Sequence, residues 1–201
     1  MSNQFLDLIQ KRRTIYAIGK NVPHSPAYLT DLIQNAIKES PSSFNSQSSR
    51  AVILFHAEHE KFWNFVQEAL KAYAKDPESA AKTEAKMASF AAGVGTVLFF
   101  EDQDVVKGLQ ASFPSYADNF PIWAEHSTAI AQFATWTALH SVGVGASLQH
   151  YNPVVDAQVH AEWDIPSTWQ LRAQLVFGSI EGEPKDKAYM DDAARFKVFG
   201  A

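Results

Sequence analysis

The chain of 201 residues contains no cysteine, so it forms no disulfide, offers no thiolate to a metal and has no cysteine nucleophile. It also lacks any block of basic residues, because its 17 lysines and arginines are scattered among 22 acidic residues for a net charge of −5. A mildly acidic chain without a basic patch argues against nucleic acid as a partner.

Long apolar runs are missing as well. The longest mainly apolar stretch, residues 122–145, is interrupted by Glu125, Gln132 and His140. A membrane-spanning helix needs about 20 predominantly apolar residues, so this stretch predicts a helix buried in a protein core. Residues 1–10 are polar and acidic where a signal peptide has a basic start and an apolar run. We therefore expect a cytoplasmic protein with no membrane partner.

Several catalytic motifs are absent. The sequence has no hydrolase nucleophile elbow, no P-loop and no dinucleotide-binding glycine loop, and the short Gly143-Val144-Gly145 run does not replace the last. The seven histidines are scattered, and His56 and His59 are expected to lie across the end of a strand. We predict no metal site.

Apolar periodicity predicts strands that alternate with helices. The first helix has Ser2 or Asn3 available as its cap, and the second begins at Ser25-Pro26. No repeat or linker divides the chain, so we expect one domain over residues 1–201, an α/β or α+β sandwich with helices covering a four- or five-stranded sheet. The predicted helices are 3–11, 26–39, 58–75, 77–92, 105–113, 122–141 and 154–162, and the predicted strands are 52–55, 96–100, 147–149 and 171–177.

Two polar segments are candidates for ligand binding. Arg12-Arg13-Thr14 follows the first helix, and two guanidinium groups beside a hydroxyl can hold a phosphate. Exposed charges at a helix C-terminus are the alternative interpretation. The segment from Ser42 to Arg50 is dense in amides and hydroxyls, which suit a heterocycle such as a flavin ring, although it could equally be an ordinary polar loop.

The order of these segments resembles the nitroreductase family. Arg12-Arg13-Thr14-Ile15-Tyr16 is followed about thirty residues later by Pro41-Ser42-Ser43-Phe44-Asn45-Ser46-Gln47, then by Gly143-Val144-Gly145, by the 147–153 segment SLQHYNP and by a Gly182-x-Pro184 tail with nearby lysines. The resemblance covers nearly the whole chain and is closest to the fatty-acid-repression-mutant-like branch. It implies an α+β sandwich with a mostly antiparallel sheet, a homodimer, and FMN bound at sites shared by two subunits.

The resemblance also implies which residues bind the cofactor. Three groups of residues bind the flavin of their own subunit, and a fourth group reaches the flavin of the other subunit. Arg195 and Lys197 are alternatives to the two C-terminal lysines for the place over the phosphate. The residues are Arg12, Arg13 and Thr14 at the phosphate and ribityl chain; Ser42, Ser43, Asn45 and Gln47 at the other subunit's flavin; Leu148, Gln149 and His150 at the reactive edge of the ring; and Lys185 and Lys187 over the phosphate.

One position departs from the family pattern. Many relatives carry a basic residue two positions after the Ser or Thr, and this chain has Tyr16 there. A cation at this place would stabilise the anionic reduced flavin, so another base must act there or that state is disfavoured. Lys82 and Lys86 are the candidates that the sequence offers.

The function implied is that of an FMN-dependent NAD(P)H oxidoreductase, which reduces nitroaromatic or quinone-like acceptors by two electrons in a ping-pong mechanism. The flavin carries the chemistry, so no catalytic side chain is expected. The aromatic residues Phe113, Tyr116, Phe120 and Trp123 could form a wall over the ring. We also expect an obligate homodimer centred on the 122–141 helix, because this helix has little polar surface to face water.

Two other functions stay open at this stage. The first is a flavin-binding regulatory protein with little turnover, in lipid or stress signalling, as the name of the branch suggests. The second is a cofactor-free interaction module that uses the apolar 122–139 helix. A colourless protein would indicate the cofactor-free module. A yellow protein that NADH or NADPH does not reduce would indicate the regulatory protein.

Overall fold

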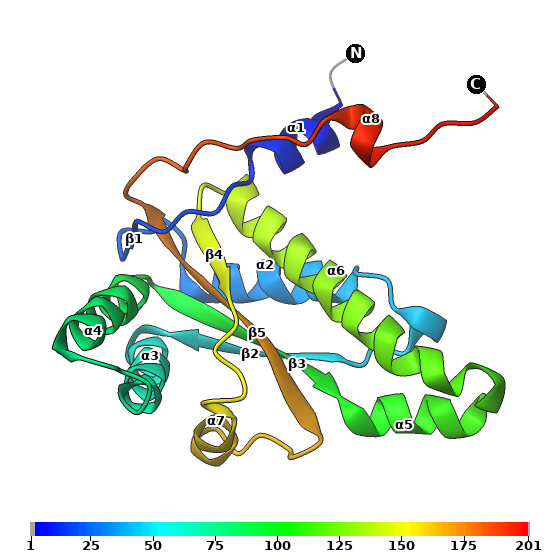
Figure 1. Cartoon of the computed structure of the whole chain (residues 1–201), viewed down its shortest axis with the longest axis horizontal. Helices are drawn as coiled ribbons and strands as arrows, with labels where there is room; N and C mark the ends of the chain where they lie inside the picture. Colours follow the sequence, from blue (N-terminus) through cyan, green and yellow to red (C-terminus); the bar gives the residue numbers. More distant parts are fainter. Residues whose placement is uncertain (1–2, 201) are drawn as a thin grey trace.

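The computed structural model describes residues 3–200. Within this range the chain forms one five-stranded sheet in the order β1-β5-β3-β2, with β4 also paired to β5, and all of these strand pairs are antiparallel. The α+β architecture with a mostly antiparallel sheet flanked by helices is thus confirmed (Figure 1). The strands are β1 (Ile18–Gly19), β2 (Ser49–Phe55), β3 (Gly95–Asp102), β4 (Gly145–Gln149) and β5 (Trp169–Ile180).

Helices cover both faces of this sheet. Most have the positions that their apolar periodicity predicts, and two short 3₁₀ helices and a C-terminal helical turn are added. The helices are α1 (Gln4–Lys11), α2 (Pro26–Lys38), α3 (His56–Lys71), α4 (Pro77–Ala91), α5 (Gln103–Ser112), α6 (Phe120–Ser141), α7 (Asp156–Glu162) and α8 (Asp192–Arg195), with the 3₁₀ helices η1 (Ser43–Asn45) and η2 (Pro114–Asn119).

Strand β3 divides the core in two. Its side chains alternate between the faces of the sheet, as the two-residue period of a strand requires. Leu98 and Phe100 pack on the side of α3, α4 and α7, whereas Val97 and Phe99 pack on the side of α2 and α6. All eight residues of β3 are buried, which explains the continuous apolar run in its sequence.

The helix caps follow the sequence. The Asn3 side chain accepts hydrogen bonds from two backbone N–H groups of α1, and the Ser25 hydroxyl accepts one from Tyr28 at the start of α2. The alternative cap, Ser2, lies outside the described residues. Among residues 3–200, no helix is long and apolar enough to cross a membrane.

Several boundaries differ from the predictions. Helix α3 ends at Lys71 rather than 75, so Tyr73 lies outside the helix and is 68% exposed. The chain turns there towards the Asp76 cap of α4, which is why the helix stops. His56 and His59 both lie in the first turn of α3, not across a strand end. Strand β5 continues to Ile180, beyond its predicted end at 177, because it pairs there with β1.

Candidate functional site

The first polar segment and the C-terminal lysines line one open cavity of about 400 Å³. This volume is in the range of small-molecule sites in proteins. A side-chain nitrogen of Arg13 donates a hydrogen bond to the backbone carbonyl of Lys185, which ties the segment after β5 to the residues after α1. The lining residues are Arg12, Arg13, Thr14, Tyr16, Lys185, Asp186, Lys187 and Ala188.

Arg12 rests on aromatic rings of α6. Its guanidinium carbon lies 4.2 Å from the centre of the Trp136 ring and 5.8 Å from that of Phe133, a cation–π arrangement that holds the side chain in place. The Nε of Arg12 and the indole nitrogen of Trp136 are buried and have no hydrogen-bond partner within residues 3–200. Buried donors are rarely left unpaired, so an acceptor bound beside Arg12 would satisfy this arrangement.

The electrostatics of this cavity also favour an anion. Burial, and then the neighbouring Arg13, lower the pKa of the Arg12 guanidinium. Burial, followed by the charges of Arg12 and Lys11, lowers the pKa of His140. In the described part of the chain, neither Arg12 nor Arg13 forms an ion pair with a carboxylate. A negatively charged ligand would therefore relieve repulsion between neighbouring positive charges.

Strand β4 lies beside the same segment. The backbone N–H of Ile15 donates to the carbonyl of Ala146 at 3.0 Å, and Thr14 forms a bridge with Ala146. The residues expected at the reactive edge of a flavin, Leu148, Gln149 and His150, follow Ala146 closely, with the first two half-buried and His150 exposed. Two of the predicted groups of site residues are therefore neighbours in one protomer.

Tyr16, the departure from the family pattern, is half exposed and has a lysine nearby. The Nζ of Lys185 lies 5.9 Å from the centre of the Tyr16 ring. The two lysines suggested by the sequence are engaged elsewhere, since Lys82 pairs with Glu78 and Lys86 lies over the rings of Phe90 and Tyr151. Lys185 is thus a cation beside the expected place.

The second polar segment does not line the same cavity. Ser42 and Gln47 line another, of about 200 Å³, between the end of α2, the start of β2 and Ser127 of α6. Ser127 and Trp136 are nine residues apart on α6, which corresponds to about 14 Å along the helix axis. In one protomer, the segment that contains Ser43 and Asn45 is therefore separated from Arg12.

This second segment has an unusual backbone. Phe44, Asn45 and Gln47 all have positive φ angles, of 56°, 50° and 49°. Such left-handed conformations cost a non-glycine residue roughly 1–2 kcal/mol, and asparagine less. Strain of this kind concentrates in loops that hold ligands, so the conformation supports a binding role over an ordinary surface loop.

The expected aromatic wall is a cluster around Phe44. The centre of the Phe44 ring lies 4.8 Å from that of Phe113, 6.2 Å from Tyr116, 5.4 Å from Phe120 and 6.3 Å from Trp123. Phe120 is buried, whereas the rings of Phe44, Phe113 and Tyr116 are exposed. The cluster lies at the N-terminal end of α6, away from the end that contacts Arg12.

A third cavity is an apolar groove along α6. Its volume is about 440 Å³, and α1, the end of α2 and α6 form its walls. Ile130 and Phe133, which line it, are 42% and 37% exposed. A contiguous apolar surface of this kind marks a site of contact with another molecule. Its other lining residues are Phe5, Leu8, Ala36, Glu39, Ser40, Pro41, Ala134, Thr137 and Ala138.

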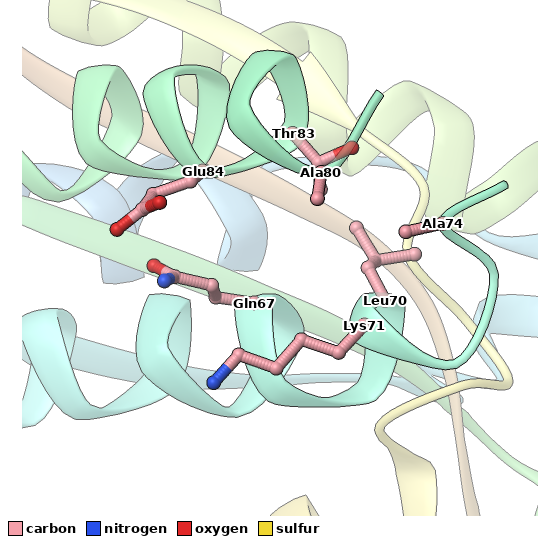
Figure 2. A pocket seen from close by; sticks show the side chains of 7 residues that line it. All are labelled: Gln67, Leu70, Lys71, Ala74, Ala80, Thr83 and Glu84. Atoms are coloured by element: carbon pink, nitrogen blue, oxygen red, sulfur yellow. The ribbon is translucent and has the colours of Figure 1, made fainter. Parts of the chain in front are cut away.

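The cavity between the C-terminal end of α3 and the N-terminal half of α4 is too small for a cofactor. This cavity has a volume of about 70 Å³, and Figure 2 shows Leu70 of α3 pointing towards Ala80 and Thr83 of α4. None of its lining residues was predicted to bind a ligand.

Two residues at the end of the second polar segment, Ser49 and Arg50, form contacts at the start of β2 that the sequence did not predict. Arg50 pairs with Asp102 at 3.0 Å, and the Ser49 hydroxyl donates to the buried Glu101 carboxylate at 2.5 Å. Burial raises the pKa of Glu101, against the opposing effect of the neighbouring hydroxyl groups of Ser48 and Ser49. The pattern that could have predicted these contacts is a Ser-Arg pair at the start of one apolar strand and a Glu-Asp pair at the end of another.

Comparison with known proteins assigns the chain to a family. The profile of the nitroreductase family matches residues 9–179. The structure is similar to that of nitroreductase CinD from Lactococcus lactis, with a TM-score of 0.92 and 46% identity over 98% of this chain and 100% of that one. Two proteins of Saccharomyces cerevisiae are also similar: HBN1 is 40% identical over 92% of this chain and 93% of its own length, and nitroreductase FRM2 is 35% identical over 95% of both. The chain therefore belongs to the nitroreductase family, as its sequence motifs implied.

Proposed function

We propose that this protein is an FMN-dependent oxidoreductase that uses NAD(P)H to reduce nitroaromatic or quinone-like acceptors by a ping-pong mechanism. The observation that carries the proposal is the cavity beside Arg12, where cationic side chains from both ends of the chain lie together and the buried Nε of Arg12 lacks an acceptor. A protein of the same fold from Desulfovibrio desulfuricans, 15% identical with a TM-score of 0.70, has been solved in complex with FMN.

The residues around the cavity fit the parts of FMN. Arg12, Arg13, Thr14, Lys185 and Lys187 supply positive charge and a hydroxyl for the phosphate and ribityl chain. Bound FMN would supply the redox chemistry, taking a hydride from NAD(P)H and passing two electrons to an acceptor. The protein's part is to bind, orient and exclude water.

The remaining predicted residues fit the ring. Leu148, Gln149 and His150 at the end of β4 would lie at its reactive edge, and Lys185 beside Tyr16 would provide the positive charge that many relatives place at position 16. The hydroxyls and amides of Ser42, Ser43, Asn45 and Gln47 would bind the ring held by a partner subunit.

Known complexes of CinD support the proposed class of acceptor. CinD has been solved with 4-nitrophenol, with chloramphenicol and with nicotinic acid, all of which contain an aromatic ring. In this chain the exposed rings of Phe44, Phe113 and Tyr116 offer a surface on which a planar acceptor could stack.

We also propose that the protein is a cytoplasmic homodimer in which residues 1–201 form one FMN-binding domain. The apolar groove with Ile130 and Phe133 supports this, because a twofold partner presenting the same face would bury it. Obligate dimers bury on the order of 2,000–5,000 Å². Separation of the Ser42–Gln47 loop from the Arg12 cavity within one protomer is a second argument for a shared site.

The test is the absorption spectrum of the purified protein. We expect a yellow protein that releases a chromophore of the mass of FMN on heating and is bleached by NADH or NADPH without oxygen. Steady-state rates at varied NAD(P)H and acceptor should then give parallel double-reciprocal lines. Release of FAD, or a colourless protein that takes up no FMN, would refute the cofactor. A yellow protein that neither nucleotide reduces would favour the regulatory alternative.

A further inference from the structure

The side chain of Arg50 joins the Ser42–Gln47 loop to the sheet. Its guanidinium group donates to the backbone carbonyl of Gln47 and, at 3.3 Å, to that of Ser49. Its other terminal nitrogen donates to the Asp102 carboxylate at 3.0 Å. The guanidinium carbon also lies 5.7 Å from the centre of the Trp169 ring. The Arg50 side chain is therefore fixed by the loop backbone, by Asp102 and by Trp169.

Apart from Arg50, the loop is held by the packing of Phe44 on neighbouring aromatic rings and by a few hydrogen bonds. Its internal hydrogen bonds are those of a single turn: Asn45 N to Ser42 O, Ser46 N to Ser43 O, Gln47 N to the Ser42 hydroxyl, and the Gln47 side-chain amide to Asn45 O at 3.5 Å. Phe44, Asn45 and Gln47 are exposed and have positive φ angles, so the isolated segment would relax to other conformations. The contact with Arg50 is at the C-terminal end of this strained run.

Asp102 is a rigid anchor for the arginine. It ends the fully buried strand β3, and its backbone N–H donates to the carbonyl of Ser48 at 3.0 Å. The other oxygen of its carboxylate accepts from the backbone N–H of Asp104 and caps α5. Because a strand and a helix both fix Asp102, its carboxylate holds Arg50 in place, and Arg50 in turn holds the backbone carbonyl of Gln47.

We propose that Arg50, held by Asp102, is a positioning residue that keeps the Ser42–Gln47 loop in the conformation that binds the flavin ring. This inference rests on the proposed function. Arginine is required because its planar fork donates in several fixed directions at once, whereas lysine is a single point charge. Arg50→Lys should therefore keep the pair with Asp102 and lose the hold on Gln47.

The experiment compares FMN with riboflavin, which has the same ring and no phosphate. Flavin-free Arg50→Lys protein is titrated with each flavin, and both affinities are expected to fall about tenfold, as for the loss of a charge-assisted hydrogen bond. At saturating FMN, the visible absorption bands of the bound ring should also shift from their wild-type positions. Arg12→Ala, which acts at the phosphate, should weaken FMN alone.

Two further variants separate positioning from general destabilisation. Asp102→Asn keeps an oxygen for the α5 cap and should reproduce the effect of Arg50→Lys even if the latter folds poorly. Lys61→Gln removes different ion pairs, with Glu58 and Glu162 on the α3 side of the sheet, and should leave both affinities and the spectrum unchanged.

The possible failures are distinguishable. Wild-type protein that binds neither flavin refutes the proposed function itself. Wild-type protein that binds both, together with folded Arg50→Lys and Asp102→Asn variants that bind them equally well, overturns only the role of Arg50. Loss of FMN affinity without loss of riboflavin affinity would also overturn it, because the effect would then act at the phosphate.

Discussion

Replacing Arg12 with alanine tests the phosphate site most directly. The substitution removes a guanidinium group that faces the cavity and the stack on Trp136, while Arg13, Lys185 and Lys187 remain. Arg13→Lys is the matched comparison, because it keeps the positive charge of the neighbouring position. We expect Arg12→Ala to weaken FMN binding far more than Arg13→Lys.

The magnitude follows from the surroundings of Arg12. A hydrogen bond to a charged group typically contributes about 1.5–3 kcal/mol. Trp136 and Phe133 already hold the guanidinium, so little side-chain entropy would be lost when the phosphate binds. The remaining cations partly compensate for the lost charge. We therefore expect a loss of about 2 kcal/mol, or about thirtyfold in affinity.

The assay is an equilibrium titration at dilute protein, with flavin fluorescence as the signal and riboflavin as the ligand without a phosphate. Riboflavin affinity should change less than threefold in Arg12→Ala, because the ring contacts are intact. Arg12→Ala that binds FMN as tightly as wild type would show that Arg12 does not contact the phosphate. Equal losses for the two flavins would show that the variant acts through the fold instead.

Three further substitutions test the interface, a buried histidine and the strained loop. Ile130→Asp should give a monomer by sedimentation and a colourless protein, because the groove along α6 would carry an unpaired charge at the dimer contact; a flavinated monomer would show that the site is not shared. Burial lowers the pKa of His59 from 6.5 to about 4, so the unfolded chain binds the proton first as the pH falls. Buried neutral His59 therefore leaves the free energy of unfolding unaffected above about pH 6.5 and should lower it by about 2 kcal/mol between pH 7 and pH 5. Urea unfolding of His59→Gln should lack this pH dependence, and the same dependence in wild type and variant would refute the reasoning. Gln47→Gly relieves a positive φ angle and should raise the free energy of unfolding by about 1 kcal/mol. Flavin binding should weaken, because the Gln47 amide is lost. A variant that is less stable than wild type and still fully flavinated would show that the loop is not strained at this residue.

The sequence predicted the parts of the fold that depend on local periodicity. The continuous apolar run of β3 was identified because burial on all sides leaves no polar alternation, and the long helix α6 because apolar residues occupy most of its circumference, including the exposed Ile130 and Phe133. The short strand β1 was missed because its two residues form a strand only through pairing with the extended β5, and that contact is not local. The helix predicted over 58–75 extends too far because Tyr73 continues the apolar period of α3, although the chain turns before it.

The candidate site was predictable to a similar extent. The cationic cluster and the amide-rich loop are visible as residue types, and the meeting of Arg13 with Lys185 could be expected only from the family resemblance. The ion pair between Arg50 and Asp102 depends on the register between β2 and β3, in which these two residues are not directly opposite. The positive φ angles of Phe44 and Gln47 have no compositional signature, since neither is a residue that favours that conformation.

Helix α6 connects the two halves of the proposed site, and this arrangement has a thermodynamic consequence. Its N-terminal half borders the Ser42–Gln47 loop at Ser127, its C-terminal half supports Arg12 at Trp136, and the apolar groove at Ile130 lies between them. If the groove is the dimer contact, each flavin joins residues of two chains. Whatever factor dimerisation adds to FMN affinity, FMN must then add to dimerisation. Sedimentation of flavin-free protein should show a dissociation midpoint at higher protein concentration than that of the FMN-saturated protein, with Lys61→Gln shifting in parallel with wild type. Identical midpoints with and without FMN would mean that each protomer binds its flavin alone, and that the loop and the Arg12 cavity serve different ligands.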